Sequence, residues 1–350
     1  KAYHTYANGA LSNEVGTLTT QNPTVDTGLY LDGADYKLMN FVKTADFSFT
    51  KQFDNGATFD KSEMPTFNVT DTRGRSVTVT LDDGRIEILT NVKPNADKQY
   101  IFSNLEYGAY QVTENNFNGY EPVSFWITVG DDASGNPAAT VVEKTGSILP
   151  VADANGDYTL TTIAKTTSLI LQKEYNGIDT GDATFQITEN GAILADPMVA
   201  TADEKNKYVF ANLQYGKTYT VVENAPTGYV GVKFTIDVTT TDDDGNPIAK
   251  INDKVDGLTE GSQSAGYDYA LVNKVKTTGF SFNKVFEENR NTTTPSFVAY
   301  KKTKDGQGVS QFEFAYQNND DNSYQYSIAD GLEYGRTYVV METNTPAGYE

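Results

Sequence analysis

The chain has 350 residues and a formal net charge of −20, and it contains 23 tyrosines, 18 phenylalanines and no cysteine. The length allows about two to four domains, and the missing cysteine excludes disulfides and thiolate metal sites. The acidity argues against nucleic-acid binding, and no apolar run is long enough for membrane insertion. The many aromatic residues and alternating threonines predict an all-β protein with no cofactor.

Three similar segments recur along the chain, and each is predicted to join the last strand of one domain to the first strand of the next. A Lys-Thr pair separates the two strands in every copy. These junctions span residues 36–51, 158–173 and 269–284. They predict domains at 44–165 and 166–276, and two partial domains at 1–43 and 277–350.

Polar residues occupy apolar positions in these junction strands. Residues two apart on a strand share a face. In the first strands the apolar alternation reaches a lysine each time, at Lys51, Lys173 and Lys284. In the last strands it reaches Asn40 and Asn273, whereas Thr162 takes this place in the middle junction.

A third repeated strand carries a glutamate in the same kind of position. Each copy begins Tyr-x-Val-x-Glu and closes on Gly-Tyr, at residues 110–120, 219–229 and 338–349. Glu114, Glu223 and Glu342 therefore share a face with a tyrosine and a valine. A carboxylate on an apolar face is costly unless it has a partner or a chemical task.

Two readings explain these lysines, glutamates and asparagines. One is a buried, hydrogen-bonded Lys–Glu pair with asparagine as a satisfied neighbour. The other is chemical, because burial lowers the pKa of a lysine and raises that of a glutamate. A neutral amine is a nucleophile, and a protonated carboxyl can polarise the asparagine carbonyl and carry a proton. Repetition on three strands favours this second reading, with a Lys–Asn isopeptide bond as product and ammonia as leaving group.

The Tyr-x-Val-x-Glu…Gly-Tyr segments resemble the E-box of Cna-B type domains, the Ig-like or prealbumin-like β-sandwiches of Gram-positive adhesins and pilins. The resemblance implies tandem β-sandwich domains in a rod, outside the cell at its surface. It also implies a self-catalysed bond between Lys173 and Asn273, with Glu223 as the catalytic residue. The protein would then modify itself once and would not be an enzyme in the usual sense.

The domain at 44–165 departs from the family pattern. It has Lys51 and Glu114, but Thr162 stands where the pattern has an asparagine. Because threonine has no carboxamide, we expect Lys51 and Glu114 to form a buried pair without a crosslink.

The two partial domains are predicted to complete each other between copies. Residues 277–350 contain the strands of Lys284 and Glu342, and residues 1–43 contain a last strand with Asn40. If Lys1 is placed after Glu350, the interval from Tyr349 to Leu38 is close to the corresponding intervals in both complete domains. Residues 1–43 of one copy would then fill 277–350 of the next, as donated strands or as the continuation of a longer repeating chain. Lys284 and Glu342 would meet Asn40 there.

The expected function is structural: a tension-bearing part of a surface fibre, pilus or adhesin stalk that binds copies of itself. The alternative is a ligand-binding adhesin module that recognises host matrix or a glycan. That alternative predicts an exposed aromatic patch or a long insertion in one domain. Trp126, which is out of phase with Phe125 and Ile127, is a candidate member of such a patch.

Overall fold

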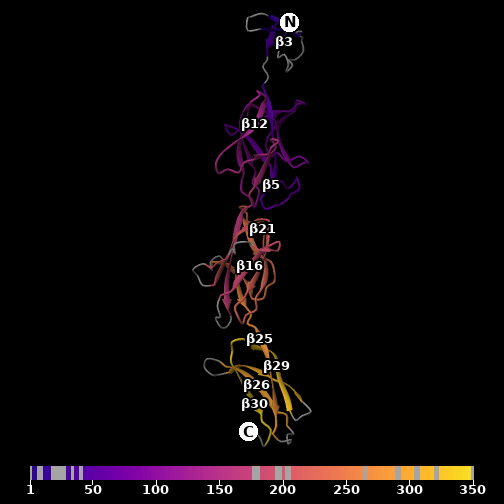
Figure 1. Ribbon diagram of the computed structural model, residues 1–350. Helices are drawn as coiled ribbons and strands as arrows, with labels where there is room; N and C mark the ends of the chain where they lie inside the picture. The colour runs from indigo at the N-terminus through magenta and orange to yellow at the C-terminus, as the bar shows by residue number, and fades with distance from the viewer. Residues whose placement is uncertain are drawn as a thin grey trace. The chain divides into compact units, whose positions relative to one another are not determined.

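The computed structural model describes four short N-terminal strands as backbone and then residues 42–175, 182–193, 199–201, 206–262, 266–287, 293–302, 308–318 and 323–347. Every regular secondary-structure element in these residues is a β-strand, which confirms the expected all-β fold (Figure 1). None of the described segments forms a helix able to cross a membrane. The chain divides into two compact units, Lys1–Ala164 and Lys165–Glu350.

The four N-terminal strands form two separate hairpins. The first pairs β1 (Ala2–Thr5) with β2 (Leu11–Gly16), and the second pairs β3 (Leu29–Asp32) with β4 (Asp35–Leu38). Asn40 lies outside the described residues.

The first sandwich, as we call the two sheets of β5–β14, follows these hairpins. One sheet has the order β12-β11-β10-β6 and the other β13-β14-β5-β9. A hairpin of β7 and β8 is separate from both sheets. The strands are β5 (Thr44–Phe53), β6 (Phe67–Asp71), β7 (Thr78–Thr80), β8 (Ile86–Ile88), β9 (Gln99–Glu106), β10 (Gly108–Glu114), β11 (Ser124–Asp131), β12 (Pro137–Val142), β13 (Val151–Ala152) and β14 (Tyr158–Thr162).

The middle sandwich, β15–β24, repeats this arrangement with two five-stranded sheets. Their orders are β18-β19-β15-β24-β23 and β17-β16-β20-β21-β22. The strands are β15 (Thr166–Tyr175), β16 (Thr184–Glu189), β17 (Ala192–Ile193), β18 (Val199–Thr201), β19 (Lys207–Gln214), β20 (Thr218–Asn224), β21 (Lys233–Thr241), β22 (Pro247–Ile251), β23 (Leu258–Ser262) and β24 (Tyr267–Asn273).

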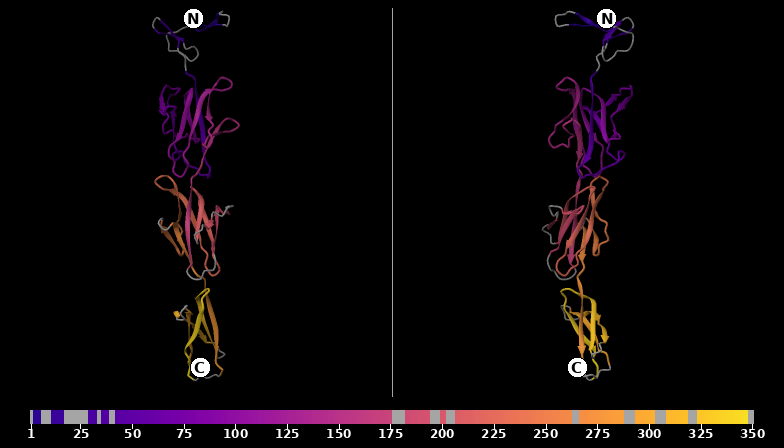
Figure 2. Two further views of the ribbon diagram at one scale, coloured as in Figure 1. Left: turned by 90° about the vertical axis from the view of Figure 1, so that its left-hand side faces the viewer. Right: turned by 45° about the vertical axis from the view of Figure 1, so that its right-hand side comes forward.

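The C-terminal strands, β25–β30, form two three-stranded sheets of order β25-β29-β28 and β27-β26-β30 (Figure 2). We call them the half sandwich. The strands are β25 (Thr277–Val285), β26 (Ser296–Lys302), β27 (Gly308–Glu313), β28 (Ala315–Asn318), β29 (Ser323–Glu333) and β30 (Tyr338–Asn344).

The period-two alternation of the sequence produces the cores. In β5, Phe47 and Phe49 are buried between exposed or half-buried neighbours, and in β15 the same holds for Leu169 and Leu171. The last strand of each sandwich lies parallel to the first, so β14 pairs with β5 and β24 with β15. This parallel pairing brings together the junction strands that begin and end a domain.

The sequence Tyr-x-Phe-x-Asn-Leu occurs at residues 100–105 and again at 208–213, and the structure explains why it recurs. Tyr100 donates its hydroxyl hydrogen to the carbonyl of Pro65 at 2.6 Å, and Tyr208 donates to Ala183 at 2.9 Å. Asn104 and Asn212 both have φ near 54°, a left-handed conformation that asparagine tolerates better than most residues. The repeat therefore marks a buried tether and a bend within β9 and β19.

Candidate functional site

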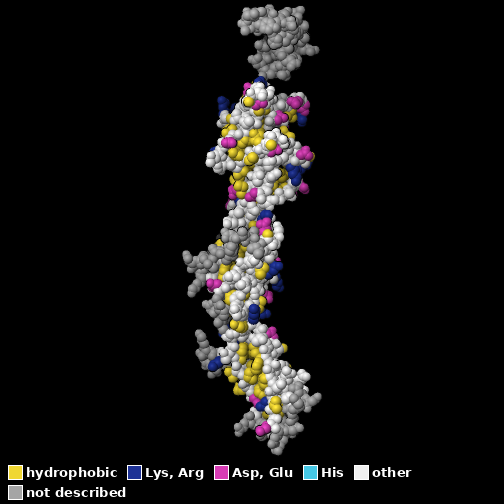
Figure 3. Space-filling view, in the orientation of Figure 1, with side chains coloured by type: hydrophobic (Ala, Val, Ile, Leu, Met, Phe, Trp, Pro, Cys, Tyr) yellow, Lys and Arg dark blue, Asp and Glu magenta, His cyan; other side chains and the backbone are white. Residues whose placement is uncertain are grey.

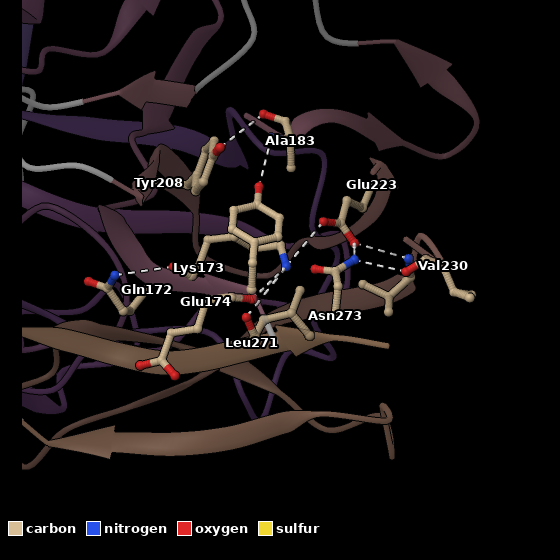
Figure 4. A network of polar contacts seen from close by, with 11 residues as sticks. Gln172, Lys173, Glu174, Ala183, Tyr208, Glu223, Val230, Leu271 and Asn273 are labelled. Carbon is tan, nitrogen blue, oxygen red and sulfur yellow. Dashed lines mark hydrogen bonds and ion pairs between the residues drawn. The ribbon is translucent and has the colours of Figure 1, made fainter. Parts of the chain in front are cut away.

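The middle sandwich brings one lysine, one glutamate and one asparagine together from three strands (Figure 4). Lys173 lies on β15, Glu223 on β20 and Asn273 on β24. Leu271 is opposite Lys173 in the parallel pair, which sets Asn273 one pleat further along the same face. All three residues were candidates from the sequence, and their side chains meet in the interior.

Glu223 connects the amine to the amide. Its Oε1 lies 3.4 Å from Nζ of Lys173, and its Oε2 accepts a hydrogen bond of 2.8 Å from Nδ2 of Asn273. One carboxyl group thus faces the nitrogen that would attack and the nitrogen that would leave. This geometry suits proton transfer between the two nitrogens.

The site is closed to solvent. The side chains of Lys173 and Glu223 are fully buried, and Asn273 is 1% exposed. Burial lowers the pKa of Lys173, against the opposing effect of the Glu223 charge. The amine is therefore easier to deprotonate than a surface lysine, and its neutral form is the nucleophilic one.

The asparagine is oriented differently from the arrangement that the sequence suggested. The sequence suggested a carboxyl that polarises the carbonyl oxygen, but the hydrogen bond runs from Nδ2 to Glu223. Nδ2 also donates to the backbone carbonyl of Val230 at 2.8 Å. A backbone carbonyl only accepts, so the NH2 side of the amide must face it. Within the described residues, Oδ1 of Asn273 is left buried without a donor.

The first sandwich holds an equivalent pair without the amide. Nζ of Lys51 is 2.8 Å from Oε1 of Glu114, with side chains 0% and 2% exposed. Thr162 is fully buried and its hydroxyl is hydrogen-bonded to the same Nζ. Burial lowers the pKa of Lys51 and raises that of Glu114. The three predicted positions therefore meet here too, with a hydroxyl in place of a carboxamide.

In the half sandwich, the described residues include the lysine and the glutamate of the cluster. Nζ of Lys284 donates to Oε2 of Glu342 at 3.0 Å, and both side chains are partly exposed. Their expected third partner, Asn40, falls outside the described residues.

Residues 230–232 also belong to the site, and the sequence analysis did not identify them. Val230 contacts the amide of Asn273, and the backbone N–H of Val232 donates to Oε2 of Glu223 at 3.2 Å. These contacts come from backbone groups, which any residue type supplies. Gly231, two residues after the Gly-Tyr pair, was the only available signal.

The comparisons with known proteins bear on the fold of the chain. Residues 168–255 match the family model of the SpaA prealbumin-like fold domain. The middle sandwich is therefore similar to the SpaA prealbumin-like domain. Together with the sheets described above, this match confirms the prealbumin-like β-sandwich fold that the E-box resemblance implied.

One curated relative of this chain is serine-aspartate repeat-containing protein D of Staphylococcus aureus, strain Newman. The two are 30% identical over 168 residues, which cover 45% of this chain and 12% of that protein. The chain therefore spans only a small part of the length of this curated relative.

Two solved structures share weaker likeness. The Bacillus anthracis TIE protein is 18% identical, with 87% of this chain and 46% of that chain covered at a TM-score of 0.35. BcpA, the major pilin subunit of Bacillus cereus, is 13% identical, with 87% and 89% covered at a TM-score of 0.30. At TM-scores this low, neither likeness carries an argument about function.

Proposed function

We propose that this chain is a structural, tension-bearing part of an extracellular fibre, pilus or adhesin stalk, stabilised by a self-catalysed isopeptide bond between Lys173 and Asn273. The observation that carries this proposal is the buried Lys173–Glu223–Asn273 cluster, in which a single carboxyl group contacts both nitrogens.

The reaction is a transamidation that balances without a co-reactant. Nζ of Lys173 attacks Cγ of Asn273, so that the Nζ–Cγ bond forms and the Cγ–Nδ2 bond breaks. Glu223 takes a proton from Nζ on one oxygen, and the leaving nitrogen receives a proton from the carboxyl group. Ammonia departs with the electron pair of the broken bond. The fold holds the amine and the amide together in a water-free site. This removes much of the entropic cost of bringing the two groups together, which the same reaction would have in solution.

The position of the bond explains its mechanical use. It would tie β15 to β24, the first and last strands of one domain, where pulling forces enter and leave. By analogy with a disulfide, closing a loop of this length stabilises the fold by about 4–5 kcal/mol through the unfolded state. Tension would then pass through a covalent bridge while the strands between remain folded.

Completion of the half sandwich by a neighbouring copy is the second part of the proposal. Phe280 is 46% exposed and Val340 is 41% exposed, whereas Leu169 and Val221, at the same positions of the middle sandwich, are 0% exposed. Figure 3 shows hydrophobic side chains gathered over β25, β29 and β26. A cavity of about 390 Å³ opens between the two sheets here. An exposed core face and free strand edges favour strand addition.

The missing strands have a counterpart in the N-terminal hairpins. In the middle sandwich, β15 pairs with the β23–β24 hairpin and β20 pairs with the β21–β22 hairpin. In the half sandwich, the equivalent edges of β25 and β30 have no strand partner among the described residues. The hairpins β3–β4 and β1–β2 have the order and the sequence needed to supply both. Lys284 and Glu342 would then meet Asn40 of the next copy and form a bond between subunits.

Mass spectrometry tests the crosslink. The intact mass of the chain should fall short of the sequence mass by at least one ammonia, and digestion should release a peptide that joins Lys173 to Asn273. Glu223→Ala should restore the missing mass in the middle sandwich. A wild-type chain in which Lys173 and Asn273 remain unmodified would refute the proposal.

Gel electrophoresis of boiled, denatured protein tests completion between copies. Covalent ladders that disappear in Asn40→Ala support donation of strands between molecules. Hairpins found packed against the half sandwich of their own molecule would contradict it. A chain that stays single, with a half sandwich filled by a further repeat in a longer protein, would show continuation instead of donation.

The adhesin alternative has one specific observation in its favour. Two cavities flank the loop at residues 143–150 of the first sandwich. One, of about 630 Å³, includes Tyr158 in its lining, and the other, of about 180 Å³, includes Trp126. A glycan array would test this function, and the fluorescence of Trp126, the single tryptophan, would report binding at the smaller cavity. No response to any glycan would leave the structural role alone.

A further inference from the structure

The segment 230–232 lies between the strand that carries the catalytic glutamate and the strand that carries the asparagine. The N–H of Val230 donates to the carbonyl of Lys274 at 2.9 Å, and the carbonyl of Val232 accepts from the N–H of Glu223 at 2.8 Å. These bonds fix the segment to β24 on one side and to β20 on the other. Its remaining polar groups are thereby aimed at the reacting side chains.

Two of those groups contact the cluster directly. The carbonyl of Val230 accepts from Nδ2 of Asn273, and the N–H of Val232 donates to Oε2 of Glu223. Nδ2 thus has two acceptors, one from the backbone and one from the carboxyl group, before any bond breaks. When the Cγ–Nδ2 bond breaks, that nitrogen gains a hydrogen and becomes ammonia, whose hydrogens both acceptors can bind.

Gly231 permits this close approach. A Cβ at this position would lie 2.6 Å from the backbone oxygen of Glu223. That distance is far inside ordinary contact, and the obstructing atom belongs to a strand backbone and cannot rotate away. A larger residue at 231 therefore has to move the segment, and with it the carbonyl of Val230 and the N–H of Val232.

The first sandwich supplies a natural comparison, because Pro122 occupies the position of Gly231. The flanking backbone bonds persist: Glu121 donates to Ile163, and Glu114 donates to Val123, both at 2.9 Å. The hydrogen bond from the backbone N–H to the glutamate carboxyl group has no counterpart here. Apart from the Lys51 ion pair, neither oxygen of Glu114 has a donor among the described residues.

We infer that the backbone at 230–232 takes part in the crosslinking reaction. The Val230 carbonyl binds the leaving ammonia, and the Val232 N–H holds the carboxyl group of Glu223 in place. Gly231 is the positioning residue, because it allows both contacts. This inference rests on the proposed crosslink. It adds that crosslinking in this fold depends on two positions, the one held by Asn273 or Thr162 and the one held by Gly231 or Pro122. The first sandwich lacks the required residue at both.

The first experiment compares Gly231→Ala with Gly130→Ala in the full chain. Gly130 lies on β11 of the first sandwich, and a Cβ there meets nothing within 4 Å. Ammonia loss in the middle sandwich is followed by intact mass over time, with circular dichroism as the check on folding. Gly231→Ala should slow the reaction by roughly 100-fold, the cost of misplacing reacting groups by about 1 Å, and Gly130→Ala should match the wild type.

A second variant separates this role from simple destabilisation. Ile236 is a fully buried residue on β21, and it pairs with Tyr219, four residues before Glu223 on β20. Ile236→Val should weaken the packing of the same sandwich and keep the wild-type crosslinking rate, whereas Gly231→Ala should slow the reaction even where it is folded. A folded Gly231→Ala with the wild-type rate overturns the inference, while an uncrosslinked wild type overturns the proposed function instead.

The second experiment builds the site in the first sandwich and does not depend on the folding of Gly231→Ala. Thr162→Asn supplies the carboxamide, and Thr162→Asn with Pro122→Gly supplies the close approach as well. The double variant should lose one ammonia more than the wild type. It should form the crosslink between Lys51 and the introduced carboxamide at least about 10-fold faster than the single variant. Equal rates in the two variants would contradict a role for the glycine.

Discussion

Thr162 occupies in the first sandwich the register position that Asn273 occupies in the middle sandwich. Thr162 is opposite Phe53 on the neighbouring first strand, and Asn273 is opposite Tyr175 in the same parallel pairing. Both are buried, at 0% and 1% exposure. A hydroxyl carries no electrophilic carbon for an amine to attack, so the proposed Lys–Asn bond has no counterpart at Thr162.

Breaking the ion pair of the first sandwich should lower the free energy of unfolding, whereas replacing both of its residues with apolar ones should not. Lys51→Met leaves the buried carboxyl of Glu114 without its cation and should lower the free energy of unfolding by about 3–5 kcal/mol. Lys51→Met with Glu114→Leu removes both charges and should be neutral or stabilising by about 1–4 kcal/mol. Denaturant unfolding followed by Trp126 fluorescence measures both values in the first sandwich. A double variant as unstable as the single one would contradict this prediction.

The stability of Lys51→Met should depend on pH in a defined direction. Burial raises the pKa of Glu114, and Lys51 opposes that rise, so the pKa stays raised when the lysine is removed. Between its ordinary value of 4.5 and the raised value, the folded state binds more protons than the unfolded state. The free energy of unfolding of this variant should therefore increase as the pH falls through that window. An increase on raising the pH would refute a buried carboxylate.

Loss of the proposed crosslink should destabilise the middle sandwich selectively. Glu223→Gln keeps the shape of the side chain but removes the proton acceptor, so the chain should keep its full mass and lose about 4–5 kcal/mol of stability there. Calorimetry should show a lower transition temperature for one unit, while Trp126 fluorescence reports an unchanged first sandwich. Thr235→Ser on the neighbouring strand is the control and should leave the crosslink and its ammonia loss as in the wild type.

The exposed core of the half sandwich should tolerate truncation that the complete sandwiches do not. Phe47 is 2% exposed and Phe280, at the equivalent position, is 46% exposed. Phe47→Ala should cost about 3–5 kcal/mol, and Phe280→Ala much less in an isolated chain. If a second copy completes the half sandwich, the cost of Phe280→Ala should rise with protein concentration. Hydrogen exchange of β25 at several concentrations measures this, and a concentration-independent result would argue against donation between copies.

The buried tyrosine tether should contribute a measurable hydrogen bond. Tyr208→Phe leaves the carbonyl of Ala183 without its donor and should cost about 1–3 kcal/mol. Tyr316→Phe, at a residue 57% exposed, should change the stability little. Thermal unfolding of the two variants provides the comparison, and equal effects would show that the hydroxyl of Tyr208 is not a structural tether.

The sequence alone determined the strand content, the repeats and the residues that share a core face. Strand alternation has a period of two residues, so the lysine, the glutamate and the asparagine could be assigned to buried faces from neighbours one pleat away. The Lys-Thr junctions likewise identified the first and last strands, because both sides of each junction recur together. These patterns depend only on residues that are close in the sequence, so they can be recognised without knowing which strands are neighbours in the fold.

Only the tertiary structure decided how the three groups face one another. Residues 173, 223 and 273 come from three strands far apart in the chain, and the orientation of the Asn273 amide depends on the backbone carbonyl of Val230. A backbone carbonyl has no sequence signature. The need for glycine at position 231 arises because a Cβ there would lie 2.6 Å from the backbone oxygen of Glu223 on β20. The exposure of Phe280 and Val340 was likewise decided by tertiary structure. Their alternation is the same as in the buried copies, but among the described strands nothing pairs with the free edges of β25 and β30.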